Sequence, residues 1–159
     1  MARASASVLI AFDGSEVSRA AVRHAAELFV GRPAVVATVW EPGLAAAVLP
    51  GTMGAMTLPA DPATIQEVDR VQGERAATVA AEGAELARSV GFDAQPQPVP
   101  DQGDVADTLM ELARERGAAV VVVGSHGISG LRNRLLGSVS RKLVEHCDRP
   151  VLVVRDHSA

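Results

Sequence analysis

The sequence is poor in residues on which several large classes of protein depend. Only one of its 159 residues is a cysteine, Cys147, so no disulfide can form within the chain and a reducing compartment is expected. Aromatic residues make up 3% of the chain and tyrosine is absent, which leaves few rings for stacking nucleic-acid bases. The formal net charge of −4 also argues against non-specific binding to nucleic acid or to anionic membranes.

Long apolar runs are missing as well. None approaches the roughly 18 residues that a membrane-spanning helix needs, and the N-terminal stretch MARASASVLIAFDG lacks the apolar length of a signal peptide. Hydrophobic residues (48%) and charged residues (21%) are present in globular proportions. We therefore predict one cytoplasmic domain over residues 1–159, with its core at about 7–155, that binds neither nucleic acid nor membrane.

Short apolar segments alternate with amphipathic ones along the chain. Strands are predicted at 7–12, 34–40, 92–100, 118–123 and 150–154, and helices at 15–30, 61–90, 103–117 and 138–147. The stretch 41–60 has three prolines, three glycines and no period, which predicts a long flexible loop. Strands that alternate with helices predict an α/β fold: an open, doubly wound, five-stranded parallel sheet with helices on both faces. Three prolines place the strand 92–100 at a sheet edge.

The segment GSHGISGLRNRLLGSVS, residues 124–140, differs from the rest of the chain. It contains four glycines and four serines, follows the buried strand 118–123, and has no acidic residue. Ligands of open α/β sheets bind at the carboxyl ends of strands, and a helix N-terminus offers unpaired N–H groups to anions. The segment therefore predicts a polyphosphate site, with the hydroxyls of Ser138 and Ser140 as further donors. The alternative is a plain strand-to-helix connection, although such connections usually take two to six residues.

The glycine spacing excludes two common phosphate loops. There is no G-x-x-x-x-G-K-[ST], so the segment is not a P-loop. Gly124, Gly127 and Gly130 have the spacing G-x-x-G-x-x-G, and they follow the fourth strand, whereas the dinucleotide-binding G-x-G-x-x-G follows the first. The longer spacing that is present is Gly124-x2-Gly127-x9-Gly137-Ser138.

The chain has this motif, Asp13 after the first strand, GSHG after the fourth and the closing RPVLVVR. In these features it resembles the universal stress protein family, in its ATP-binding subgroup. The resemblance covers about residues 7–155. It implies the strand order 3-2-1-4-5 of the adenine nucleotide alpha hydrolase-like fold. It also implies ATP or another adenine nucleotide as ligand, with Mg²⁺ or Mn²⁺ carried by the phosphates.

The resemblance also implies a set of site residues. The triphosphate is expected on Gly124, Gly127, Gly137, Ser138, Val139 and Ser140, with ribose or adenine at Asp13 and the adenine edge at the backbone of Val39. Gly130 is added to this site, although it lies outside the motif and its alternative role is to relieve a bend. For Asp13 the alternative is a simple turn before a helix. Trp40 either shields the nucleotide or packs in the core, and both interpretations stay open.

No nucleophile is paired with a general base in the segment, so strong catalysis is not expected. The preferred interpretation is a nucleotide-responsive regulatory protein of the stress response, with an unknown protein partner. The alternatives are a slow ATPase or phosphotransfer enzyme on the same fold, and a stress-response scaffold that binds no nucleotide. His126 has no cluster of metal ligands near it in the sequence, so no metal site is expected there.

The last strand has a bare apolar edge. The run 151–154 contains no proline, glycine or charge within it, and an edge strand of this kind pairs readily with another chain. The family resemblance points to the same assembly. We therefore predict a homodimer held by Val151, Leu152, Val153 and Val154.

Overall fold

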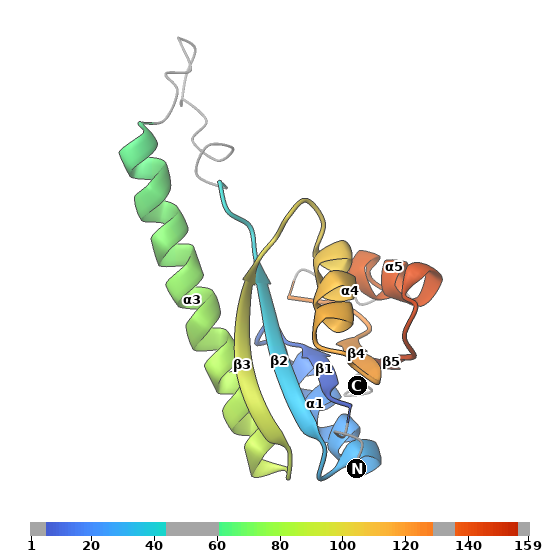
Figure 1. Cartoon of the computed structure of the whole chain (residues 1–159). Coiled ribbons are helices and arrows are strands. Elements are labelled where there is room, and N and C mark those ends of the chain that lie inside the picture. The colour runs from blue at the N-terminus through green and yellow to red at the C-terminus, as the bar shows by residue number, and fades with distance from the viewer. Residues whose placement is uncertain (1–5, 44–60, 129–135, 156–159) are drawn as a thin grey trace.

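The computed structural model describes residues 6–43, 61–128 and 136–155. Its elements are β1 (Val8–Ala11), α1 (Glu16–Phe29), β2 (Pro33–Trp40), α3 (Pro62–Ser89), β3 (Asp93–Pro100), α4 (Val105–Glu115), β4 (Val120–Gly124), α5 (Ser138–His146) and β5 (Val151–Val154). All strand pairs are parallel, and the order in the sheet is β3-β2-β1-β4-β5 (Figure 1). The predicted fold class and strand order are confirmed. Most of the predicted loop 41–60, and Gly130, lie outside the described residues.

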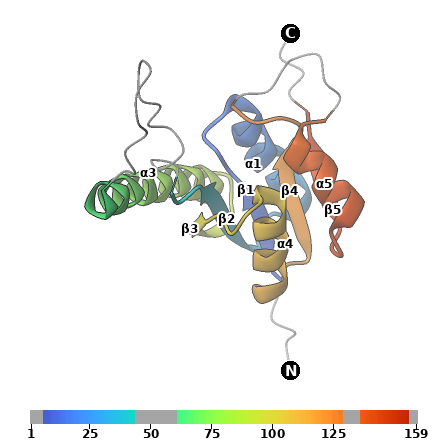
Figure 2. The same ribbon diagram turned by 90° about the horizontal axis from the view of Figure 1, so that it is seen from above.

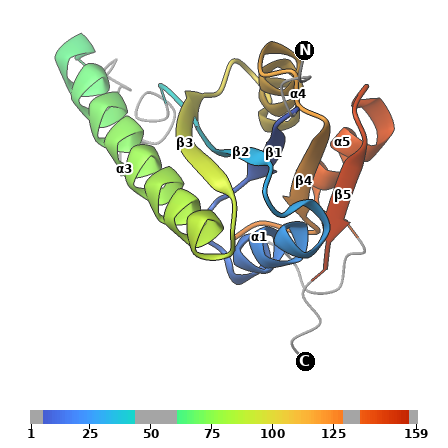
Figure 3. The same ribbon diagram turned by 60° about the horizontal axis from the view of Figure 1, so that its bottom comes forward.

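Helices cover both faces of the sheet, with α1 and α3 on one side and α4 on the other (Figures 2 and 3). Side chains of successive strand residues alternate between the two layers. Val8 and Ile10 pack with α1 and α3, whereas Leu9 packs with α4 and with Leu143 of α5. Because both faces of a doubly wound sheet are buried, its central strands β1 and β4 carry no polar side chain, and this explains their continuous apolar runs in the sequence.

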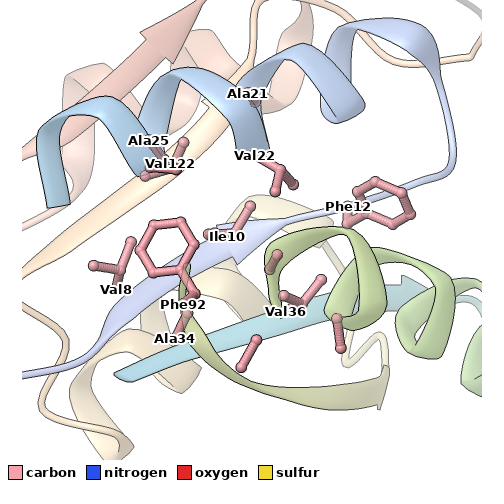
Figure 4. Close-up of a cluster of buried hydrophobic side chains, with 14 of the residues drawn as sticks. Val8, Ile10, Phe12, Ala21, Val22, Ala25, Ala34, Val36, Phe92 and Val122 are labelled. Carbon is pink, nitrogen blue, oxygen red and sulfur yellow. The ribbon is translucent and has the colours of Figure 1, made fainter. Parts of the chain in front are cut away.

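The layer between the sheet and helices α1 and α3 contains the ring of Phe12 (Figure 4). Phe12 is 2% exposed, and helix α3 approaches it at Gly83. A Cβ atom added to Gly83 would lie 2.6 Å from Phe12 Cδ1 and 2.7 Å from Val36 Cγ1. Real side chains do not tolerate such contacts without movement, so glycine is what allows α3 to lie this close to the sheet.

The N-terminal part of α3 extends beyond the sheet, past the carboxyl end of β2 (Figure 1). Two contacts attach it there. The Trp40 ring lies against Gly73, where an added Cβ would be 3.3 Å from Trp40 Cζ2. The N–H of Gly43 donates to Asp69 Oδ1 at 2.7 Å. In the described part of the chain, α3 included, no helix combines the length and apolarity that crossing a bilayer requires.

The two edges of the sheet differ in their backbone donors. β3 carries Pro96, Pro98 and Pro100 at alternate positions, so the three missing N–H groups all fall on one side of the strand. The other side pairs with β2 along the whole strand. The prolines therefore blunt the outer edge of β3, as the sequence predicted.

Candidate functional site

A cavity of about 360 Å³ lies at the carboxyl ends of β1, β2 and β4. The chain passes from β1 outward to β2 and β3 and then returns to β4 on the other side of β1, so the cavity is at the point where the strand order reverses. It is lined by Ala11, Phe12, Asp13, Ser18, Ala37, Val39, Val105, Leu109, Val123, Gly124, His126, Gly127, Gly137, Ser138, Val139 and Ser140.

One half of the cavity is apolar. Ala37 and Val39 come from β2, Val105 and Leu109 from one face of α4, and Val123 from β4. The α4 residues are one helical turn apart, so they form a continuous wall opposite the strand ends. An apolar slot of this kind suits a flat ring system, which would bury its faces against aliphatic side chains.

The other half is formed by the glycines and by the start of α5. Helices α1 and α4 begin with side-chain caps, since Ser15 Oγ accepts from the N–H of Ser18 and Asp104 accepts from backbone N–H groups of its helix. The N-cap of α5 is Gly137, which has no side chain to do this. The α5 N-terminus is therefore left without a side-chain cap at the position where it lines the cavity.

The first backbone bond of α5 runs from the N–H of Arg141 to the carbonyl of Gly137, at 3.0 Å. The preceding N–H groups, those of Ser138, Val139 and Ser140, have no partner among the described residues. Unpaired N–H groups at the positive end of a helix dipole attract anions. The start of α5 thus presents unpaired donors to the cavity, and Asp13 is the one carboxylate in the described lining.

Ser125 fixes the start of α5 relative to the sheet. Its carbonyl accepts from the Gly137 N–H at 2.6 Å and from Ser140 Oγ at 3.0 Å, and its own N–H donates to the carbonyl of Val154 at 2.8 Å. Ser140 Oγ also lies 3.1 Å from the Gly137 carbonyl, and Ser140 is 2% exposed. The hydroxyl of Ser140 is thus engaged with backbone carbonyls, so it is the N–H of Ser140, and not the predicted hydroxyl, that remains as a donor.

Asp13 connects β1 to the segment after β4. Its Oδ1 accepts from the N–H of Ser15 at 2.9 Å, and its Oδ2 accepts from the N–H of Ile128 at 3.1 Å. A Cβ atom on Gly127 would lie 2.9 Å from the same Oδ2. Gly14 follows with a φ of +81°, so the Asp13–Gly14 pair also forms a turn. Asp13 therefore forms a turn before α1 and lines the cavity at the same time.

Packing against α1 is a second reason for a glycine at position 124. A Cβ atom there would be 2.7 Å from Val17 Cγ1, because α1 crosses the end of β4 at this point. The glycine thus lines the cavity on one side and admits α1 on the other.

Helices α4 and α5, which both line the cavity, are joined by surface ion pairs. Lys142 Nζ lies 2.8 Å from Asp107 Oδ2 and 3.2 Å from Asp104 Oδ1. The pKa of Asp104 is lowered, first by the hydrogen bond from the backbone N–H of Asp107 and then by Lys142. The pKa of Lys142 is raised, first by its hydrogen bond to Asp107.

The cavity brings together most of the residues predicted from the sequence: Asp13, Val39, Gly124, Gly127, Gly137, Ser138, Val139 and Ser140. Gly130 lies outside the described residues, as do the neighbouring Arg132 and Arg134. Trp40 does not line the cavity, since its ring packs on α3.

Sequence reasoning missed two features of the site. It did not assign the wall of Val105 and Leu109, whose spacing on α4 resembles that of ordinary core residues. It considered His126 only as a metal ligand. His126 lines the cavity, and its Nδ1 lies 3.1 Å from Ser125 Oγ. Within the described ranges there is no group of three or more His, Cys, Asp or Glu residues that could hold a metal ion.

The model of the universal stress protein family matches residues 6–155 of this chain. The universal stress protein YxiE of Bacillus subtilis is 33% identical over 159 aligned residues, which cover 93% of this chain and 97% of that protein. The solved structure of MJ0577 from Methanocaldococcus jannaschii shares the fold, with a TM-score of 0.77 at 21% identity, and the match covers 99% of this chain and 100% of that one. A universal stress protein solved in complex with cAMP has a TM-score of 0.62 at 28% identity, covering 96% of this chain and 98% of that one.

Proposed function

The chain belongs to the universal stress protein family, and on that premise we propose that its cavity binds an adenine nucleotide, with ATP as the first candidate. The observation that carries this proposal is the uncapped start of α5 beside an apolar slot in one cavity. A nucleotide has the same two halves, a flat base and an anionic phosphate chain. The cAMP complex of a relative supports an adenine nucleotide as the ligand class.

In this proposal the adenine lies in the slot between Ala37 and Leu109, with its edge at the backbone of Val39. Asp13 accepts hydrogen bonds from the ribose hydroxyls. A carboxylate has about four acceptor positions, so the two backbone N–H groups that Asp13 already binds leave room for a ligand. The same negative charge would repel phosphate, so we propose that the phosphates lie at the start of α5 and not against this carboxylate.

The phosphates are proposed to accept from the N–H groups of Ser138, Val139 and Ser140. Gly124, Gly127, Gly130 and Gly137 would allow the backbone to approach them. The described residues offer no set of carboxylates for a resident ion, and Mg²⁺ commonly binds proteins through the phosphates of its nucleotide. Mg²⁺ or Mn²⁺ would therefore enter with the nucleotide, held by phosphate oxygens.

We propose that the nucleotide is a signal and that the protein regulates a partner in the stress response. Slow hydrolysis is the competing proposal. Asp13 is held by two backbone N–H groups, which favours a structural and binding role over that of a general base. Steady-state turnover with Mg²⁺ and ATP separates the two, because rates of about 1 s⁻¹ or above belong to ordinary enzymes.

We also propose a homodimer through the outer edge of β5. The carbonyl of Pro150 accepts from Val121 of β4, and that of Val154 accepts from Ser125 just after β4. The alternate residues Val151 and Val153 therefore direct their N–H and C=O groups away from β4. These groups are available to pair with a second copy across a two-fold axis. Unlike β3, the strand β5 contains no proline, so each residue of Val151–Val154 keeps its backbone N–H.

The function is tested by calorimetry with ATP, adenosine and inorganic tripolyphosphate. The parent should bind ATP more tightly than it binds either adenosine or tripolyphosphate. Gly137→Val should weaken ATP binding by at least about tenfold, since its Cβ would start 3.2 Å from the Ser125 carbonyl oxygen and its methyl groups would crowd the donors. Ala77→Val, on the exposed side of α3, is the control and should bind like the parent. A folded parent that binds neither ATP nor adenosine rejects the proposal.

A further inference from the structure

We infer that His126 determines specificity for phosphorylated nucleotides: its imidazole contacts the phosphate chain, so that the affinity for ATP, but not for adenosine, depends on the charge of His126. This inference rests on the proposed function. It adds a residue that the glycine motif does not include and makes nucleotide binding dependent on pH.

The position of His126 places it at the phosphate end. It follows Gly124 and precedes Gly127, and all three line the cavity. A Cβ atom on Gly137, the N-cap of α5, would lie 3.3 Å from His126 Cα, so the backbone of His126 is in direct contact with the start of that helix. His126, a half-buried residue, therefore lies at the same end of the cavity as the unpaired N–H groups of α5.

The described lining of the cavity contains two ionisable side chains, Asp13 and His126, and neither lysine nor arginine. Two cations on the neighbouring helices, neither of which lines the cavity, have other partners. Arg19 of α1 lies 5.7 Å from the Phe12 ring centroid and pairs with acids of α1 and α3. Lys142 of α5 is paired with acids of α4. Among the described residues that line the cavity, His126 is thus the only side chain that can bring positive charge to a phosphate.

The hydrogen bonding of the ring leaves one nitrogen for a ligand. Nδ1 lies 3.1 Å from Oγ of Ser125, and Ser125 is 4% exposed, which holds that side of the ring. Nε2 has no partner in residues 6–43, 61–128 and 136–155. When the Ser125 hydroxyl donates to Nδ1, Nε2 carries the hydrogen and can donate it to a phosphate oxygen. Protonation of the ring makes both nitrogens donors and adds a positive charge.

The direction of the pH effect follows from the charge. Histidine ordinarily changes its charge between pH 5 and 8. A protonated ring attracts phosphate and a neutral ring only donates a hydrogen bond to it, so the contribution of His126 to ATP affinity should increase as the pH falls. Asp13, the other ionisable group of the described lining, is present in every variant compared, so its contribution cancels in their ratio.

The test is calorimetry of the parent, His126→Gln and His126→Lys with ATP and with adenosine, at about pH 6 and pH 8. ATP titrates its own phosphate in this range, but that effect is common to all variants and cancels in the ratio of dissociation constants. We expect His126→Gln to weaken ATP binding about tenfold at the lower pH and only about twofold at the higher one. His126→Lys should keep the ATP affinity at both values. Adenosine affinity should stay unchanged in all three proteins.

The matched control is His24→Gln, which removes an exposed histidine of α1 whose neighbour is Glu27. It should bind ATP like the parent at both pH values. If the parent binds ATP and the ratio of parent to His126→Gln is the same at both pH values, this inference is wrong and the proposed function stands. It is also wrong if His126→Gln weakens adenosine as much as ATP. A parent that binds neither ligand refutes the proposed function itself.

Discussion

The contact between Gly127 and Asp13 gives a prediction whose size can be worked out from the structure. Gly127 is not among the glycines with positive φ, so alanine can adopt its backbone conformation without strain. The cost of Gly127→Ala arises instead from the added methyl group, 2.9 Å from Asp13 Oδ2. Carbon and oxygen atoms do not pack this closely, so the carboxylate must turn away and release the N–H of Ile128.

The expected loss is that of one hydrogen bond to a charged group. Such bonds contribute about 1.5–3 kcal/mol, and the exposed position of this one favours the lower end. A loss of about 1.4 kcal/mol corresponds to a tenfold change in affinity. We therefore expect Gly127→Ala to weaken ATP binding about tenfold in calorimetry, through both the displaced loop and the displaced carboxylate. Circular dichroism melting should show that the variant is folded.

A double-mutant cycle tests the cause. In an Asp13→Ala background the carboxylate is gone, so the methyl group of Gly127→Ala meets nothing and should change the ATP affinity by less than about twofold. The reasoning is refuted if Gly127→Ala has the same effect with and without Asp13. It is equally refuted if the single variant binds ATP like the parent.

Three further predictions concern the scaffold. Gly83→Ala places a methyl group 2.6 Å from the Phe12 ring, so the free energy of unfolding in urea should fall by about 1–3 kcal/mol. For comparison, Ala77→Gly, on the exposed side of the same helix, should lower it by about 1 kcal/mol. A Gly83→Ala variant that is more stable than the parent would contradict the close approach of α3. Asp104→Ala should cost about 1 kcal/mol near neutral pH by removing the α4 cap. The pKa of Asp104 is lower in the folded state, so this difference should be complete above the pKa of the unfolded carboxyl and should shrink as the pH falls from there through the lowered pKa of the folded state. A difference that persists in acid would assign it to packing. Val153→Pro removes an N–H from the outer edge of β5, so the mass measured by light scattering should shift from about twice the 16.4 kDa chain mass toward that of the monomer. A variant that stays fully dimeric at tens of micromolar would refute the proposal that the dimer forms through this edge.

The fold could be predicted because its signals are local. Each strand except β3 is a short, mainly apolar run, each helix has an apolar face, and Ser15 was recognisable as a cap that the structure shows bonded to the N–H of Ser18. The prolines of β3 restrict that strand to an edge wherever it lies in the chain. The close approach of α3 was not predictable in this way, because Gly83 is one glycine among many in the sequence and its two neighbours, Phe12 and Val36, are distant along the chain.

The candidate site could be predicted only as far as its motif. Glycine spacing and the helix that follows identify the end of the cavity at which we propose that phosphates bind, since both lie within one continuous segment. The apolar end combines β2, β4 and α4, and residues such as Val105 have the pattern of any buried helical position. The bond from Ile128 to Asp13 joins residues 115 positions apart. Contacts of this kind depend on the completed sheet, so a single sequence does not contain them in readable form.

The position of Trp40 also determines what the protein's fluorescence can report. The chain has one tryptophan and no tyrosine, so nearly all of its ultraviolet emission originates from this one ring. The ring lies against Gly73, in the half of α3 that extends past the sheet, and does not line the cavity. Emission therefore monitors the attachment of that half-helix, whereas circular dichroism averages over all helices. Local opening can have a lower free energy than global unfolding, so a denaturation curve followed by emission can precede the one followed by circular dichroism, and the gap between them measures how independently this half-helix detaches.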